Sequence, residues 1–259
     1  RAASIKRQLK KAPDIEDISG LTPKKLLSQI ASRCHQIVAA QHECLVNDIL
    51  PSLAENGIEY VSPVNFTAEQ KSFTQQLFQT NIFPLLTPLR IDTENFPNIS
   101  NLQLHAAFLL KQMEGIQPSE NGVFFDKNQP PISIVQIPSG MPRVIWFGDN
   151  GVKKSFCLLE ELIIQYGTLL FPGFSVVQTM LFKITRDADV SVDEYRDNDF
   201  IGAMEEVLVQ RESSFAVRIL CNQSSPAILQ VLAKKLDLNA NDIYQIDGIM
   251  DPSTLLDIT

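Results

Sequence analysis

The sequence TPKKLLSQIASRCHQIVAAQHECLVNDILPSLAENGIEYV, residues 22–61, contains the change of pattern that decides the fold. In its first part the apolar side chains recur in steps of three and four, which predicts an amphipathic helix over residues 22–56. Proline lacks a backbone N–H, and glycine tolerates a left-handed conformation. We therefore expect a kink at Pro51 and the end of the helix at Gly57. The β-branched and aromatic residues at 58–61 then predict a short strand.

The sequence before and after this stretch shows the same change from a helical region to a region of strands and helices. Residues 1–20 combine a short basic helix with a polar loop. A capping box at Thr67-Ala-Glu-Gln70 predicts a helix to about residue 79, with Phe73 and Leu77 on its inner face. Runs rich in β-branched and aromatic residues predict strands at 102–110, 132–137, 144–147, 176–184, 217–221 and 243–246. Apolar runs between them predict helices at 158–166, 196–211 and 226–236.

These expected elements indicate the fold class. The strands come singly and in pairs rather than in strict alternation with helices, which favours an α+β fold over a doubly wound one. We expect a helical-bundle remnant in residues 1–57, followed by an α+β head domain in residues 58–259 with a mostly antiparallel sheet. A helix as long as 22–56 needs packing partners, and only a short piece precedes it. The N-terminal region is therefore expected to belong to a larger helical domain.

The charge of the chain limits its partners. It has 259 residues with 22 basic and 30 acidic side chains, which give a formal net charge of −8. A duplex-binding protein normally shows a basic footprint, so we expect no nucleic-acid partner. No apolar run approaches the ~18 residues of a membrane helix, so we expect no transmembrane segment. Residues 1–35 are nevertheless basic. This region could face a polyanion or form solvated helix faces, and we favour the second interpretation.

The cysteines and histidines show no metal-binding spacing. The four cysteines are Cys34, Cys44, Cys157 and Cys221, and the three histidines are His35, His42 and His105. Reduced, mostly buried thiols are expected, which suits the cytoplasm. His35 and His42 share a face of the long helix, but no carboxylate or cysteine completes a ligand set with them.

One segment combines charges in a pattern that could carry chemistry. Phe182-Lys-Ile-Thr-Arg-Asp-Ala-Asp189 ends an expected strand. Asp187 and Asp189 could hold Mg²⁺ there, and Lys183 and Arg186 could bind phosphate oxygens. In the structural alternative, Arg186 pairs with a neighbouring carboxylate. The surrounding sequence is strongly acidic and would repel a polyanion, so we favour the structural alternative.

Several stretches taken together resemble the ATP-dependent bacterial polyphosphate kinases. Residues 86–92 read LTPLRID, and residues 96–104 read FPNISNLQL. Both are similar to the head-domain signature of that family, and 182–189 is similar to its Thr-Arg-Asp-Ala-Asp segment. The stretches 1–7, 211–218 and 242–248 are similar too, and all of them keep the family's order.

This resemblance implies an expected activity. The parent enzyme would move the γ-phosphoryl group of ATP onto polyphosphate through a phosphohistidine, with Mg²⁺. Its partners would be ATP and polyphosphate, and its head domain would form a homodimer. The asparagine that approaches ATP and the phosphorylated histidine match no residue of this chain. The resemblance thus implies that the chain serves architecture and dimerisation and lines part of the polyphosphate path. It also implies that the chain alone does not catalyse the phosphoryl transfer. It also allows membrane association of the parent enzyme.

Two other functions remain open at this point. The chain could be a purely structural dimerisation scaffold that never contacts a substrate. Alternatively, Asp187 and Asp189 could form a self-sufficient metal-dependent transferase site. The sequence contains neither GxGxxG nor GxxxxGK[ST], and no candidate base lies beside these aspartates, which argues against the second alternative.

Overall fold

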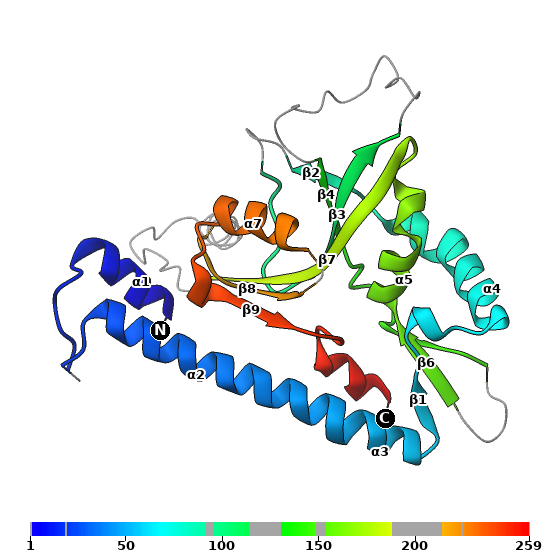
Figure 1. Cartoon of the computed structure of the whole chain (residues 1–259), viewed down its shortest axis with the longest axis horizontal. Helices are drawn as coiled ribbons and strands as arrows, with labels where there is room; N and C mark the ends of the chain where they lie inside the picture. Colours follow the sequence, from blue (N-terminus) through cyan, green and yellow to red (C-terminus); the bar gives the residue numbers. More distant parts are fainter. Residues whose placement is uncertain are drawn as a thin grey trace, which may run out of the picture.

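The computed structural model describes residues 2–18, 20–91, 96–113, 131–148, 154–187, 214–223 and 225–258. At one end, the short helix α1 (Ala2–Lys11) lies beside the long helix α2 (Pro23–Cys44) (Figure 1). Helix α2 begins at the predicted position, although the Thr22 side chain makes no capping hydrogen bond. Within the described ranges, no helix is long and apolar enough to cross a membrane.

The long helix predicted for residues 22–56 is confirmed. Helix α2 passes through a π-helical segment, Leu45–Ile49, into α3 (Leu50–Glu55), and Figure 1 shows one continuous rod. The π-helical turn precedes Pro51, whose missing N–H removes a regular helical hydrogen bond. Gly57 then has a φ of 81°, the left-handed conformation expected at the end of a helix.

A six-stranded sheet forms the centre of the head, in the order β2-β4-β3-β7-β8-β9. The strands are β2 (Leu89–Ile91), β3 (Leu104–Gln112), β4 (Ile132–Gln136), β7 (Phe174–Arg186), β8 (Ala216–Asn222) and β9 (Ile243–Ile246). Every neighbouring pair is antiparallel except β8 and β9, which are parallel. The predicted α+β class with a mostly antiparallel sheet is therefore confirmed.

Alternating side chains of the central strands enter two separate cores, as the period of two in a strand requires. Phe108 and Leu181 face the core beneath α5 (Leu159–Tyr166) and the end of α4 (Ala68–Leu77). Ala107 and Phe182 face the core beneath α7 (Pro226–Lys235). Gly167 follows α5 at a point where a Cβ would overlap the buried Phe108 ring, so only glycine fits there.

A smaller sheet joins the helical region to the head. Its order is β1-β6-β5, formed by β1 (Ile58–Tyr60), β6 (Lys154–Leu158) and β5 (Val144–Trp146). Its buried Phe156 packs in one cluster with Leu45 of the long helix. The remaining helical turns are Pro63–Asn65, Phe78–Ile82, Phe83–Leu85, Gly167–Leu170, Ala240–Asp242 and Pro252–Ile258.

Most predicted elements are present, and the differences are local. Strands β2 and β6 were not predicted, and the predicted inner face of α4 was partly wrong. Phe73 is 45% exposed and makes an edge contact with Phe147, whereas Thr74 and Phe78 are fully buried. The helix predicted at 196–211 lies outside the described residues. The domain boundary at residues 57/58 stays a prediction.

Candidate functional site

Lys183 and Arg186 both lie on β7 but belong to different clusters. Lys183 is on the same face of the strand as Leu181, and its Nζ lies 3.1 Å from Asp251 Oδ2. Arg186 follows a register shift at the end of β7, next to Thr185. In the described structure the two cations share no partner, so they do not converge on one phosphate-sized position.

The Lys183 cluster is built around Arg143, just before β5. The guanidinium donates to both carboxylate oxygens of Glu160, in the first turn of α5, with 3.2 Å between Nε and Oε2. Its Nη1 lies 3.1 Å from Asp251 Oδ2. Glu160 is buried, and Asp251 also accepts a hydrogen bond from Ser253. These four charged side chains, the Arg143 network, connect both sheets with α5 and the C-terminal turn.

The cations of this network hold Asp251 in its ionised form. Burial raises the pKa of Asp251, but hydrogen bonds from Ser253 and Lys183 and the nearby Arg143 outweigh it and hold the pKa below its ordinary value. Asp251 is therefore an anion that bridges two cations near neutral pH.

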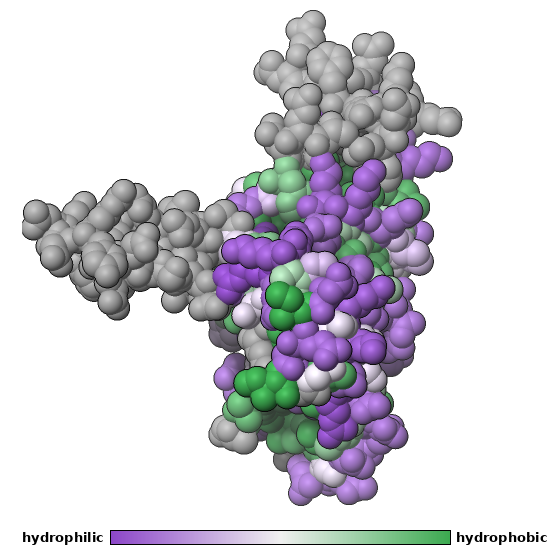
Figure 2. Space-filling model, turned by 90° about the vertical axis from the view of Figure 1, so that its left-hand side faces the viewer, coloured by the Kyte–Doolittle hydropathy of each residue, from purple (hydrophilic) through white to green (hydrophobic). Residues whose placement is uncertain are grey.

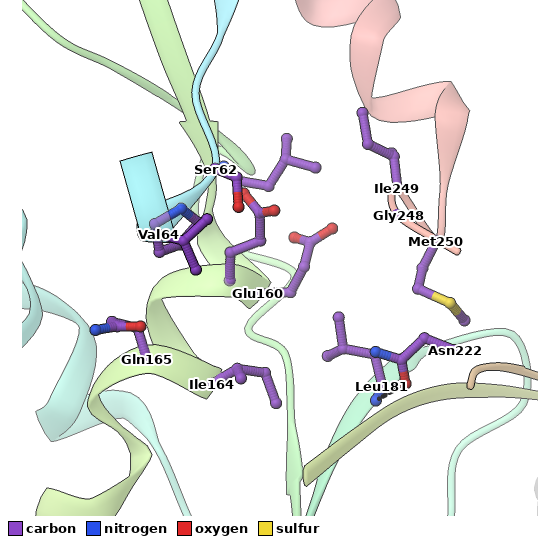
Figure 3. A pocket seen from close by; sticks show the side chains of 13 residues that line it. Ser62, Val64, Glu160, Ile164, Gln165, Leu181, Asn222, Gly248, Ile249 and Met250 are labelled. Atoms are coloured by element: carbon purple, nitrogen blue, oxygen red, sulfur yellow. Dashed lines mark hydrogen bonds between the residues drawn. The ribbon is translucent and has the colours of Figure 1, made fainter. Parts of the chain in front are cut away.

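Two cavities adjoin the Arg143 network. The first has a volume of about 260 Å³ and is lined by Glu160, Glu161, Asn222 and Met250, among others. Figure 3 shows side chains from the α5 side and from the C-terminal turn converging on it. The second has about 230 Å³, and its lining includes Arg143 and Asp251. The network thus forms part of the wall of both cavities.

Glu161 also lines the first cavity, and its pKa is shifted. Its carboxylate accepts hydrogen bonds from the Tyr60 hydroxyl and, at 3.1 Å, from the backbone N–H of Leu158. Burial nevertheless raises the pKa of Glu161 to about 7, since desolvation of the charge outweighs both hydrogen bonds. Burial, together with the neighbouring Glu161, also raises the pKa of Tyr60.

The raised pKa of Glu161 predicts a pH dependence of stability. An acid with a higher pKa in the folded state stabilises the protein below its unfolded pKa and loses that contribution as pH rises through the folded pKa. The free energy of unfolding of the wild type, measured relative to that of Glu161→Gln, should therefore fall between about pH 4.5 and about pH 7. Above about pH 7 the difference should stay constant. Urea unfolding at a series of pH values measures this. Glu59→Gln, on the exposed side of β1, is the control, and identical pH profiles for wild type and Glu161→Gln would contradict the prediction.

Arg186 binds backbone rather than a carboxylate. Its Nε lies 3.1 Å from Ile99 O and its Nη1 lies 2.6 Å from Ser214 O. Its own N–H donates to Asn101 Oδ1 at 2.8 Å. The position of Arg186 at a junction agrees with the structural alternative, but among the described residues its guanidinium binds two backbone carbonyls and no carboxylate. Its guanidinium connects the ends of three chain segments.

Asp187 is held by the N-terminal helix. Its Oδ2 lies 3.2 Å from Arg7 Nη1 of α1, and its side chain is 6% exposed. Asp189 lies outside the described residues. Within the parts of the chain that the structure describes, no group of three or more His, Cys, Asp or Glu side chains could hold a metal ion. Magnesium binding by Asp187 and Asp189 stays a prediction.

Sequence reasoning missed Arg143, Glu160 and Asp251. One signal was available for Glu160, because Phe156-Cys-Leu-Leu-Glu-Glu-Leu-Ile-Ile164 places two acids inside an apolar run. A charge in such a run is usually paired when it is buried. Nothing local identified its partner, which lies 17 residues earlier in the chain.

Comparisons with known proteins assign most of the chain to two family models. The model described as the polyphosphate kinase middle domain matches residues 69–258. The model described as the polyphosphate kinase N-terminal domain matches residues 1–61. The two matches follow one another in order and leave only a short stretch between them.

Individual relatives agree with these matches. The chain is 33% identical over 246 residues to a polyphosphate kinase of Bacillus anthracis, covering 94% of this chain and 34% of that protein. It is 31% identical over 261 residues to one of Mycobacterium avium, covering 100% and 35%. The crystal structure of polyphosphate kinase from Porphyromonas gingivalis matches with a TM-score of 0.72 and 18% identity, covering 98% of this chain and 33% of that one. The chain thus spans about a third of the length of the curated relatives it matches.

Proposed function

The chain belongs to the polyphosphate kinase family, and we propose that it acts as the N-terminal and middle part of an enzyme that extends polyphosphate from ATP. The observation that carries this proposal is the ordered pair of family matches over residues 1–61 and 69–258. In the proposed reaction the terminal phosphate of ATP passes through a phosphohistidine to polyphosphate, with Mg²⁺ as the counterion. Phosphoryl transfer of this kind depends mainly on positioning and charge neutralisation.

The contacts of His35 and His105 argue against either of them being the phosphohistidine. His105 is 3% exposed, and burial lowers its pKa to about 4. The ring of His35 stacks on Tyr244 at 4.0 Å, and its Nε2 lies 3.3 Å from Asn241 O. A buried imidazole and a stacked one are both poorly placed to attack ATP. We therefore assign His35 and His105 to packing.

The role that we propose for this chain is architectural. It would hold the catalytic part of the enzyme through the head and take part in a homodimer. Lys183, Arg186 and Asp187 would brace the sheet, and their contacts with Asp251, Ile99 and Arg7 support that role. We also propose a cytoplasmic location, which the expected reduced state of the cysteines favours.

Labelling with ATP tests this proposal. We would incubate this chain and a protein extended to the length of the relatives with γ-labelled ATP and Mg²⁺. The extended protein should carry acid-labile label, and the present chain should remain unlabelled. His42→Gln in the extended protein is the matched control and should label normally. Stable label on His35, His42 or His105 of this chain would contradict the proposal. Sedimentation of the same two proteins reports whether the head self-associates.

A further inference from the structure

Helices α1 and α2 pack loosely on the head. Helix α2 runs alongside β9 and the turn Ala240–Asp242 (Figure 1), yet only Pro23 and Ala31 of its 22 residues are buried. One half-buried side chain of α2, Val38, packs against the larger core of the head. A cavity of about 320 Å³ lies between α1 and the start of β8, and one of about 660 Å³ lies between residues 37–49 and the C-terminal turn. Such spaces contrast with the dense packing of a protein interior.

Charged side chains hold α1 to the head. Lys6 Nζ lies 2.7 Å from Asp242 Oδ1 and 2.9 Å from the carbonyl oxygen of Val217. Arg7 Nη1 lies 3.2 Å from Asp187 Oδ2. Both aspartates are buried, so salt screens these pairs less than it screens exposed ones. The face of the molecule at this end is predominantly hydrophilic, with only small separate hydrophobic areas (Figure 2).

Helix α2 is held by the segment 241–244, which also contains the acid that binds Lys6. The ring of His35 stacks on Tyr244 with 4.0 Å between the ring centroids. His35 Nε2 also lies 3.3 Å from the carbonyl oxygen of Asn241. Both helices are therefore fixed to the head at nearly the same place. We call the contacts of Lys6, Arg7 and His35 with the head the polar latch.

The other end of α2 is attached in a different way. Leu45 is 1% exposed and packs with Phe156 and Leu158 of the small sheet. It begins the π-helical segment Leu45–Ile49, and Pro51 follows directly in α3. π-helical turns and prolines are the usual places where a long helix bends. The long helix thus has an apolar anchor and a bending point at one end, and the polar latch towards the other.

From this arrangement we propose that residues 2–44 form an arm that the polar latch holds against the head and that swings open about the π-helical segment. Because the latch consists of ion pairs and one stacked ring, its opening exposes much less apolar surface than the separation of a packed core. The arm contains most of the region that matches the N-terminal family model, and the head contains the region that matches the middle model. The latch therefore sets the position of one region relative to the other. This motion does not depend on the proposed reaction.

The native cysteines of the chain report on this motion. Burial, together with the neighbouring Cys34, raises the pKa of Tyr244, which places the Cys34 thiol at the latch. Cys34 is half-buried there, whereas Cys44 is exposed, and Cys157 and Cys221 are buried in the two cores. A small maleimide should therefore react with Cys34 mainly through the open arm. Cys44 is the internal reference for the rate of reaction.

Loss of a latch contact should speed the labelling of Cys34. In Lys6→Gln the rate, relative to that of Cys44, should rise about tenfold, because a lost charge-assisted hydrogen bond shifts the opening equilibrium by about that factor. Arg7→Gln should act in the same direction. Lys11→Gln, at the exposed last residue of the same helix, is the matched control and should label as wild type does.

Amide hydrogen exchange of the same variants distinguishes a swinging arm from an unfolded helix. Faster labelling of Cys34 with unchanged amide exchange in α2 supports the arm, because a rigid swing keeps the hydrogen bonds of the helix. A parallel rise in amide exchange over α2 would mean local unfolding and would overturn the inference. Equal labelling of Cys34 in Lys6→Gln and Lys11→Gln would also overturn it, as would labelling of Cys157 and Cys221 in both latch variants, the sign of global unfolding. The experiment with labelled ATP does not involve the latch, so the two proposals can fail separately.

Discussion

Replacement of Arg143 by methionine should destabilise the protein by about 3–5 kcal/mol, the usual cost of leaving a buried charge without its partner. Glu160 is 1% exposed, and both of its carboxylate oxygens accept hydrogen bonds from the Arg143 guanidinium. Methionine fills a similar volume but donates no hydrogen bond. The same change also removes one of the two cations that contact Asp251.

Urea unfolding of three variants separates the charge effect from lost packing. Arg143→Met should show the full loss. The double variant Arg143→Met with Glu160→Met should recover most of it, because replacing both members of a buried ion pair by apolar side chains is often neutral. Lys183→Met should cost less, since its partner Asp251 is 20% exposed and keeps Arg143. Equal stabilities for wild type and Arg143→Met would show that Glu160 is not held by this pair.

The fold was predictable wherever the sequence carries a local period. The long helix, most strands of the main sheet and the α5 and α7 helices follow from the spacing of apolar residues. Strand β6 was missed because Lys154–Leu158 runs directly into the apolar start of α5, so one continuous run contains two elements. What makes it a strand is pairing with β1, almost a hundred residues earlier in the chain, which no local window reveals.

The candidate site was much less predictable than the fold. Residues 183–189 form a local motif, yet the partners of Lys183 and Asp187 come from opposite ends of the chain, at Asp251 and Arg7. Spacing along the sequence contains no information about such pairs. The sequence could suggest that these charges are paired, because isolated buried charges are costly. It could not identify the partners, and for Arg186 it suggested a carboxylate where the described contacts are backbone carbonyls.

Replacement of Arg186 by alanine should lower the free energy of unfolding by about 3 kcal/mol, since it removes two hydrogen bonds from a charged donor. The guanidinium holds Ile99 O at 3.1 Å and Ser214 O at 2.6 Å. Burial lowers the pKa of Arg186, and no carboxylate among its described contacts offsets that cost. The carbonyl groups therefore supply the compensation, and both would lose their donor.

Thermal and urea unfolding of Arg186→Ala measures this loss, with Arg33→Ala as the matched control. Arg33 is exposed on α2 and, among the described residues, donates a hydrogen bond to Gln36 at 3.2 Å, so its removal should change stability by less than about 0.5 kcal/mol. Arg186→Lys should restore little, because an ammonium group cannot reproduce the two directions of the guanidinium fork. The same substitutions in the enzyme of full length decide between bracing and substrate binding. If Arg186→Ala lost activity with an unchanged melting temperature, Arg186 would have to act on the polyphosphate path instead of at the end of β7.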